Sequence, residues 1–293
     1  MVANVLLTGA NGGIGRLTAL ALAERGHRVF GTMREIGGAN RAAALELVEA
    51  ARSLPGSLMI FDMELASQRS VEGAVAQVLA VAGHLDAVVG AAGLTTMGLA
   101  ETMTDQQVLY QLDVNLVGPH RVLRAVLPSM RARRAGVLIH VSDVLGRVSL
   151  PLMGIHCAGK AALEALVDAY RHELAPLGIE STLVQPGFFP TGFVERLEVG
   201  DDHARMAGYD AGAARLDRLG DAVRRAIMGD DPPDPRIVAD TIVTLVELEP
   251  GSRPDRFVVD GRDGAPLLRM NDAYRRAQAE VMAALGLPDE GDS

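Results

Sequence analysis

Residues 2–15 read VANVLLTGANGGIG, an apolar run followed by a turn that contains four glycines. The run has the length of a buried strand, and residues 13–25 have the pattern of a helix. Glycines allow the backbone to approach a pyrophosphate, and the amino end of a helix supplies N–H donors and the positive end of a dipole. This stretch therefore predicts the first strand–turn–helix unit of a dinucleotide-binding fold.

The rest of the chain continues the same alternation of strands and helices. Strand-length apolar runs fall at residues 28–33, 58–61, 86–91, 136–142, 179–184 and 256–259. Helix-length amphipathic segments fall at residues 42–52, 71–81, 105–134, 156–177, 235–248 and 272–285, the third of them interrupted near Gly118-Pro119. This alternation is typical of a parallel sheet covered on both faces. We predict an α/β fold with a Rossmann-type doubly wound parallel sheet.

All 293 residues are expected to form a single domain. Residues 1–187 would form the cofactor-binding and catalytic core. Residues 188–235 mix Gly, Asp, Arg and Pro with short helical pieces, which indicates a substrate lid. Residues 236–293 would add a helix, a strand and a tail. In a sheet of this kind, ligands bind beyond the carboxyl ends of the strands, so we expect the functional residues along that edge.

Composition and charge narrow the class of protein. The formal net charge of −9 argues against nucleic-acid binding, which depends on neutralising phosphates. No apolar run approaches the roughly 18 residues of a membrane helix, and the start of the sequence lacks a basic leader with a cleavage site. The single cysteine excludes an internal disulfide and a cysteine metal cluster. We expect a soluble, cytoplasmic protein with no metal site.

The residues after the second expected strand indicate which dinucleotide binds. A site for NAD usually has a carboxylate there to hold the ribose hydroxyls, but this chain has Met33 followed by Arg34. An arginine can pair with a 2′-phosphate, and Met33 removes the acid that would repel it. The alternative for Arg34 is a solvated charge. We predict NADP(H), with Asp62 either accepting from the adenine amino group or capping the following turn.

Residues 142–160, SDVLGRVSLPLMGIHCAGK, are expected to carry the chemistry. They end in Lys160, the only lysine among the 28 Lys and Arg residues of the chain. A compact, titratable ammonium differs chemically from a permanently charged guanidinium, so this position is expected to need what an arginine cannot do. His156 and Asp143 precede Lys160 in the same stretch.

Together these motifs resemble those of the short-chain dehydrogenase/reductase family. The resemblance rests on TGANGGIG at 8–15, Asp62, Asp113-Val-Asn115, the stretch 142–160, and Pro186-Gly187 followed by Thr191. The segments VFGTMRE at 29–35, CAGKAALEAL at 157–166 and VQPGFFPTGF at 184–193 are similar to the hydroxysteroid and retinol dehydrogenase-like branch. The resemblance implies NADP(H)-dependent oxidation or reduction of bulky apolar alcohols and ketones.

The resemblance also implies roles for single residues. In the family, a Tyr exchanges a proton with the substrate oxygen, a Ser steadies that oxygen, a Lys holds the nicotinamide ribose, and an Asn lies in the preceding long helix. Lys160 and Asn115 match the Lys and the Asn, whereas His156 stands at the Tyr position and Asp143 at the Ser position. Ser142 cannot simply replace the missing Ser, because adjacent residues leaving a strand point to opposite sides. An irregular strand end would still allow it.

The cofactor-binding residues that we expect lie along the whole edge of the sheet. They are Thr8, Gly9, Asn11, Gly13, Ile14, Gly15, Arg34, Asp62, Gly90, Ala91, Lys160, Pro186, Gly187 and Thr191. The family's Asn-Asn-Ala-Gly after the fourth strand is altered here to Gly90-Ala91-Ala92-Gly93, whose small residues still suit a close approach of the cofactor.

Three hypotheses remain for the chemistry of Asp143, His156 and Lys160. Free histidine titrates at about 6.5, so a histidine could act as general acid or base in an NADP(H)-dependent reductase or dehydrogenase. An Asp–His pair could instead move protons in a redox-neutral isomerase, dehydratase or cyclase that retains NADP(H). The third hypothesis is a binding relative that has lost catalysis, with His156 packed against Asp143.

The start of the expected lid predicts an apolar substrate pocket. Phe188, Phe189 and Phe193 would line it, since sites for bulky ligands are mainly hydrophobic. A polyketide-like or other polycyclic substrate from secondary metabolism would fit. By resemblance, the helices at 105–134 and 156–177 would build a four-helix interface in a homodimer or homotetramer.

Overall fold

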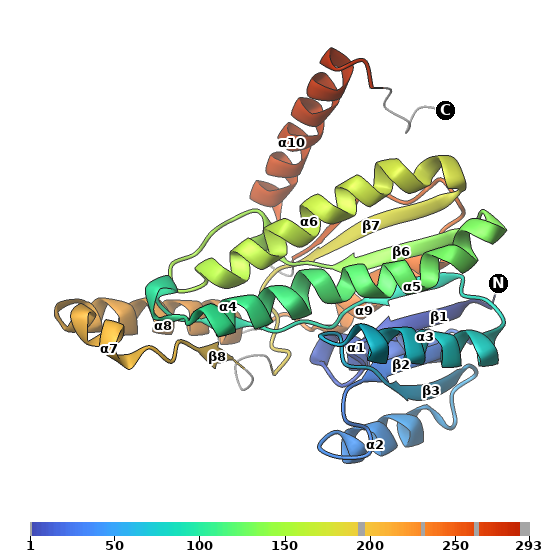
Figure 1. The fold of residues 1–293 in the computed structure, drawn as a ribbon, viewed down its shortest axis with the longest axis horizontal. Helices are drawn as coiled ribbons and strands as arrows, with labels where there is room; N and C mark the ends of the chain where they lie inside the picture. Colours follow the sequence, from blue (N-terminus) through green and yellow to red (C-terminus); the bar gives the residue numbers. More distant parts are fainter. Residues whose placement is uncertain (1, 193–196, 230–231, 261–263, 288–293) are drawn as a thin grey trace.

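A parallel sheet of seven strands, in the order β3-β2-β1-β4-β6-β7-β9, runs through the protein (Figure 1). The computed structural model describes residues 2–192, 197–229, 232–260 and 264–287. The strands of this sheet are β1 (Asn4–Thr8), β2 (Arg28–Met33), β3 (Ser57–Asp62), β4 (Ala87–Gly90), β6 (Gly136–Val141), β7 (Ile179–Pro186) and β9 (Arg256–Val259). The predicted doubly wound parallel sheet is therefore confirmed.

Helices cover both faces of the sheet. The longer ones are α1 (Gly13–Glu24), α2 (Arg41–Ala51), α3 (Gln68–Ala82), α4 (Asp105–Leu112), α5 (Gly118–Arg133), α6 (Gly154–Leu174), α8 (Ala213–Met228), α9 (Arg236–Glu247) and α10 (Ala265–Ala284). Apolar side chains of α1, α2 and α9 pack on one face, and those of α3, α5 and α6 pack on the other. The described helices include no segment with the length and hydropathy of a membrane span.

The order of the strands places a crevice next to β1. Thr8, the last residue of β1, pairs with Thr32 of β2 on one side and with Gly90 of β4 on the other. The chain crosses from β1 toward β3 on one side and from β4 toward β9 on the other, so the connections after β1 and β4 lie on opposite faces. At such a switch point the loops diverge and leave room for a ligand.

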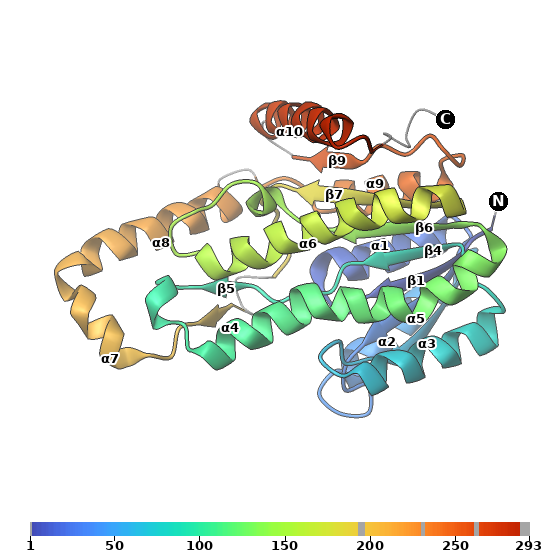
Figure 2. The ribbon, with the colours of Figure 1, turned by 45° about the horizontal axis from the view of Figure 1, so that its top comes forward.

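The segment expected to form a lid lies beyond the carboxyl ends of the strands (Figure 2). It contains β8 (Glu198–Val199), α7 (His203–Met206), the 3₁₀ segment η6 (Ala207–Gly212) and α8. β8 pairs in parallel with β5 (Thr96–Met97), which follows β4, and so ties this segment to the body of the protein. Within the chain as described, these two short strands form a sheet of their own. Residues 288–293 of the expected tail lie outside the described ranges.

Several helix boundaries differ from the prediction by a few residues. The expected interruption near Gly118-Pro119 is a π-helical turn, η2 (Asp113–Val117), which ends directly before Gly118 and separates α4 from α5. Pro119 lies in the first turn of α5, where a helix tolerates the missing N–H. The last helix begins at Ala265 rather than at residue 272, because Pro266 occupies its first turn and Leu267 is buried.

Candidate active site

A cavity of about 440 Å³ opens along the carboxyl ends of the central strands. The residues predicted from the sequence that line it are Thr8, Gly9, Asn11, Gly13, Ile14, Gly15, Arg34, Ala91, Asp143, His156, Lys160, Pro186, Gly187, Phe188, Phe189 and Thr191. Asp62, Gly90 and Asn115 are not among the described residues of its wall, and Phe193 lies outside the described ranges. The structure thus brings the glycine turn together with Asp143, His156 and Lys160.

The glycine turn forms a cradle at the start of α1. Gly9 has a φ of +72°, and a Cβ on it would lie 2.6 Å from Cα of Ala92. A Cβ on Gly13 would lie 2.5 Å from the carbonyl oxygen of Thr191. Gly12, the N-cap of α1, has no side chain to occupy the N–H groups of the first turn. Because these donors and the positive end of the helix dipole meet the cavity wall, the turn fits the pyrophosphate of a dinucleotide.

Arg34 lies at the far end of this nucleotide region. Its Nη1 atom is 2.9 Å from the hydroxyl oxygen of Tyr110 and 3.8 Å from Oε2 of Glu64. The Asn40 side chain donates to the carbonyl oxygen of Arg34 at 2.8 Å and accepts from the Asn11 side chain at 3.0 Å. The glycine turn and the loop that carries Arg34 are therefore linked through Asn40, and the Arg34 side chain lines the same cavity.

Asp62 and Gly90 lie beside the cavity rather than in its wall. Asp62 ends β3 with an exposed side chain, and the next residue, Met63, turns inward and lines the cavity. Gly90 faces the buried ring of His140, whose Nδ1 atom would lie 3.2 Å from a Cβ at this position. Successive residues at a strand end face opposite sides, so only Met63 of these two lines the described cavity, and the role of Asp62 stays a prediction.

Asn115 supports the loop that follows β4, whereas Lys160 reaches the end of β6. The Asn115 side chain donates to the carbonyl oxygen of Leu94 at 2.7 Å and accepts from the Leu94 N–H at 2.8 Å. It comes from the π-helical turn η2, a feature often found at functional sites. Lys160 is 8% exposed, and its Nζ atom donates to the carbonyl oxygen of Val141 at 3.1 Å. Asn115 thus shapes the cavity through the loop, while Lys160 lines it directly.

Asp143 and His156 form a hydrogen-bonded pair in the cavity wall. Nε2 of His156 lies 2.8 Å from Oδ2 of Asp143, and Oδ1 of Asp143 accepts from the Leu145 N–H at 2.7 Å. His156 lies in the first turn of α6, whereas Asp143 caps the 3₁₀ turn η3 (Val144–Gly146) just after β6. The His156 side chain is 5% exposed and that of Asp143 is 22% exposed, so the carboxylate is the more open partner.

The surroundings of Asp143 favour its charged form. Burial alone would raise the pKa of this carboxyl, but the hydrogen bond from His156, the charge of Lys160 and the Leu145 N–H together outweigh it. The pKa of Asp143 therefore lies below its ordinary value of 3.8. At neutral pH, Asp143 is a carboxylate that accepts hydrogen bonds and can orient the imidazole ring.

Ser142 does not take the place of the missing serine. Its side chain is 3% exposed, and its hydroxyl donates to Oε1 of Glu164 at 2.8 Å. Glu164, a buried partner of Ser142 that is not among the described residues of the cavity wall, was not predicted from the sequence. The available signal was its spacing on α6, four residues after Lys160, but charges at this spacing are usually solvated.

Several residues of the cavity wall were not predicted from the sequence. They include Met63, Glu64, Leu65, Thr95, Tyr110, Val114, Val144, Leu145, Met153 and Glu198. Several of them are apolar residues whose place depends on how loops pack, which a linear pattern does not indicate. Leu145, Met153 and Cys157 form a buried apolar cluster with Phe188 packed against it. Phe189 is 3% exposed and belongs to the main core.

Comparison with known proteins agrees with this geometry. The sequence profile of the family described as short chain dehydrogenase matches residues 3–201. The chain is 32% identical to 3-ketodihydrosphingosine reductase of Bacteroides thetaiotaomicron over 67% of this chain and 68% of that protein. It is 35% identical to human 17-beta-hydroxysteroid dehydrogenase type 1 over 66% of this chain, but the match spans only 58% of the human enzyme.

A solved structure extends the similarity to nearly the whole chain. A short-chain dehydrogenase from Streptomyces avermitilis superposes with a TM-score of 0.77 at 27% identity, covering 98% of both chains. The profile match includes the glycine turn, Asp143, His156 and Lys160, and the superposition covers 98% of the chain. This chain therefore belongs to the short-chain dehydrogenase family.

Proposed function

We propose that the protein is an NADP(H)-dependent oxidoreductase of a bulky apolar alcohol or ketone, with His156 as the general acid and base. One observation carries the proposal: the 2.8 Å contact between His156 Nε2 and Asp143 Oδ2 lies in the wall of the cavity that also holds Lys160 and the glycine turn. The two curated relatives are named as a reductase and a dehydrogenase, which supports the same class of reaction.

The nucleotide half of the cavity suits NADP(H). The glycine turn would hold the pyrophosphate, Arg34 would pair with the 2′-phosphate, and Lys160 would hold the nicotinamide ribose, as the resemblance implies. The bound nicotinamide supplies or accepts the hydride. Glu64 lies 3.8 Å from Arg34, so a 2′-phosphate would compete with this carboxylate for the guanidinium.

The proton would pass through the imidazole ring of His156. The family's Tyr and Ser positions, here His156 and Asp143, flank the place of the substrate oxygen. A developing negative charge on that oxygen would be repelled by ionised Asp143, by roughly 4 kcal/mol for charges about 4 Å apart at an effective dielectric of 20. A protonated His156 ring and the Lys160 ammonium oppose this repulsion. Their positive charges are therefore required for hydride chemistry in this site.

A second candidate is redox-neutral proton transfer, in an isomerase, dehydratase or cyclase. The lowered pKa of Asp143 favours it, because an ionised carboxylate that orients an imidazole makes a general base without any hydride step. Ser142 also points away to Glu164, so no serine hydroxyl steadies the substrate oxygen from its family position. In this case the bound nucleotide would shape the cavity without reacting.

One experiment separates the two candidates. The purified protein is incubated with NADPH or NADP⁺ and a panel of apolar cyclic ketones and alcohols, while nucleotide absorbance and product mass are followed together. Nucleotide consumption with a mass change of two hydrogens supports the oxidoreductase. Turnover with unchanged mass, or with loss of water and no nucleotide consumption, supports the second candidate. If His156→Ala and Asp143→Ala both retain full turnover, neither mechanism operates.

A further inference from the structure

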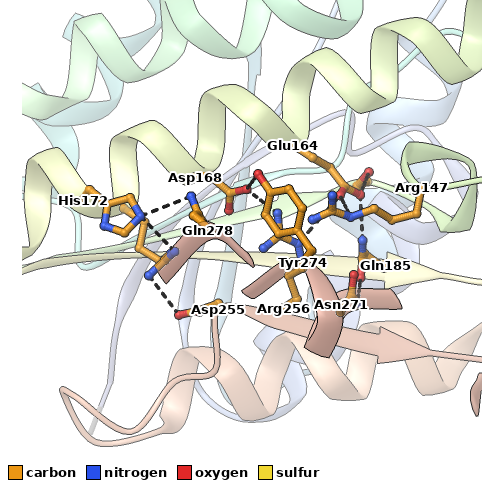
Figure 3. Close-up of polar contacts among 12 residues, drawn as sticks. Arg147, Glu164, Asp168, His172, Gln185, Asp255, Arg256, Asn271, Tyr274 and Gln278 are labelled. Carbon is orange, nitrogen blue, oxygen red and sulfur yellow. Dashed lines mark hydrogen bonds and ion pairs between the residues drawn. The ribbon is translucent and has the colours of Figure 1, made fainter. Parts of the chain in front are cut away.

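Four ionisable side chains form a buried stripe along α6. His156, Lys160, Glu164 and Asp168 are spaced four residues apart and are 4%, 8%, 2% and 4% exposed. Residues at this spacing lie on one face of a helix. The first two line the cavity, whereas Glu164 and Asp168 take part in a polar network behind it (Figure 3).

Glu164 holds the chain on both sides of Asp143. Its Oε1 atom accepts from the hydroxyl of Ser142 at 2.8 Å and from the side chain of Gln185 at 2.8 Å. Its Oε2 atom forms an ion pair with Nε of Arg147 at 3.0 Å. Ser142 directly precedes Asp143, and Arg147 directly follows the 3₁₀ turn that Asp143 caps. The carboxylate of Glu164 therefore bridges the two ends of the loop that presents Asp143.

The loop packs closely against this carboxylate. A Cβ on Gly146 would lie 2.3 Å from Oε1 of Glu164 and 2.9 Å from the hydroxyl oxygen of Ser142. A second arginine, Arg256 of β9, lies 3.8 Å from Oε2 of Glu164. A buried carboxylate is tolerated when it is paired and hydrogen-bonded. Here Oε1 accepts two hydrogen bonds, and Oε2 lies at ion-pair distance from Arg147 and Arg256 without a hydrogen bond among the described residues. The position of the loop is thus coupled to the charge of Glu164.

We propose that Glu164 is a positioning residue for Asp143, acting through Ser142 and Arg147 to hold the Asp143 carboxylate against His156. The inference rests on the proposed function, since it names a residue that supports the same site. Glu164 itself has no contact with His156. Its role is to fix the backbone from which Asp143 reaches the imidazole ring.

The outer half of the stripe provides a matched control. Asp168 forms an ion pair with Arg256, and it accepts from the hydroxyl of Tyr274 on α10 at 3.1 Å. It therefore shares the helix, the burial and the charge of Glu164. None of its described contacts is with the loop at residues 142–147. Asp168→Asn should weaken the docking of α10 and leave the Asp143–His156 pair in place.

The test compares Glu164→Gln, Ser142→Ala and Asp168→Asn with the full-length wild-type protein. Glutamine keeps an acceptor for Ser142 but loses the ion pair with Arg147, whereas Ser142→Ala removes only the hydroxyl. Ring ¹⁵N signals of His156 are followed over pH and assigned by their loss in His156→Gln. The melting temperature and the pH profile of kcat are measured in parallel.

The positioning role predicts the same change in Glu164→Gln and Ser142→Ala. His156, Lys160 and the Cys157 thiol face Asp143 from α6, and the Leu145 N–H faces it from η3. Loosening the Asp143–His156 pair weakens the hydrogen bond that lowers the pKa of Asp143, so that pKa rises. The acid limb of the kcat pH profile then moves to higher pH. We expect kcat to fall about 10- to 100-fold, as misplacement of a catalytic group does. Asp168→Asn should lower the melting temperature without moving the limb.

Ser142→Ala removes a single hydroxyl group, so this variant is expected to fold. The proposal is overturned if the ¹⁵N signals of His156 and the acid limb of the kcat pH profile both stay unchanged in it. It is equally overturned if Asp168→Asn moves them as far as Glu164→Gln does. The ¹⁵N signals of the His156 ring can be measured without any enzymatic turnover. A protein inactive on every substrate would therefore refute the proposed function while the role of Glu164 is still decided.

Discussion

Nε2 of His156 lies 2.8 Å from Oδ2 of Asp143, although the two residues are 13 positions apart and belong to different elements. The carboxylate is fixed by the Leu145 N–H and by the loop that Glu164 holds, and the ring is fixed by the first turn of α6. The pair therefore meets because two rigid elements converge, and the imidazole has one defined orientation in the cavity wall. Substitutions at the pair should affect chemistry more than cofactor binding.

Asp143→Asn tests this pair with a change of charge and almost no change of shape. The amide cannot offset a positive charge on His156, so we expect kcat to fall about 100-fold or more, within the range for loss of acid–base catalysis. The affinity for NADPH, measured by fluorescence titration, should stay within about twofold of wild type, because the nucleotide contacts lie elsewhere. An equal loss of affinity and of kcat would contradict the separation of the two regions.

The same variant has a predicted signature in stability. The folded pKa of Asp143 lies below 3.8, so its charged form stabilises the fold above that pH and the contribution is lost as pH falls through the folded pKa. Asp143→Asn should be less stable than wild type at neutral pH, and the difference should shrink in strong acid. Urea unfolding at neutral pH and at about pH 3 measures it, the lower value chosen to lie below the ordinary carboxyl pKa.

Arg34→Ala should remove most of the preference for NADPH over NADH. A hydrogen bond to a charged group contributes about 1.5–3 kcal/mol, so we expect a loss of about 10- to 100-fold in NADPH affinity and little change for NADH. Arg52→Ala, at an exposed guanidinium beyond α2, is the matched control and should change neither affinity. Equal binding of both nucleotides by the wild-type protein would refute the role of Arg34.

His140→Leu should make the protein more resistant to mild acid. The ring is buried in β6, its two nitrogens have no hydrogen-bond partner among the described residues, and burial lowers its pKa to about 4. The unfolded chain takes up a proton near the ordinary pKa while the folded chain does not, so wild type loses about 2 kcal/mol between pH 7 and pH 5 from this group. Urea unfolding at both pH values should show this loss reduced in His140→Leu, and unchanged when the exposed His84 is replaced instead.

Phe188→Ala should weaken the binding of an apolar substrate and leave the affinity for NADPH unchanged. Phe188 lines the cavity and packs on the cluster of Leu145, Met153 and Cys157. Its loss removes apolar contact area, so KM for an apolar substrate should rise about 10-fold, corresponding to roughly 1.4 kcal/mol. Phe189→Ala is the contrasting variant, since that ring belongs to the core and its loss should lower the melting temperature. A change in NADPH affinity in Phe188→Ala would place this residue in the nucleotide region instead.

The parallel sheet could be predicted because its signal is local. Each buried strand appears as an apolar run, and the glycine turn after β1 marks the first crossover, so the fold and the family follow from the sequence. The break in the long helix could be predicted from Gly118-Pro119, but its π-helical form could not, because the turn Asp113–Val117 directly before them has no glycine or proline. The turn can be recognised only in the folded structure, where it brings the Asn115 side chain to the carbonyl oxygen of Leu94.

The site could be predicted only in part, for reasons of geometry. Asp143, His156 and Lys160 were found because they occupy family positions at fixed spacing. Glu164 was missed because its partners, Ser142, Arg147, Gln185 and Arg256, come from separate elements and meet only in the folded chain. Asp62, predicted either to accept from the adenine amino group or to cap a turn, ends β3 with an exposed side chain, and its neighbour Met63 lines the cavity.

Lys160 has a practical consequence for labelling chemistry. It is the only lysine of the sequence, it is 8% exposed, and its amine is bonded to the carbonyl oxygen of Val141 at the base of the cavity. Amine-directed acylating reagents usually modify surface lysines, but the other 27 basic Lys or Arg positions of this chain are arginines, which these reagents do not modify. Any side-chain amine that reacts is therefore Lys160, and its rate of modification reports directly on whether a ligand fills the cavity.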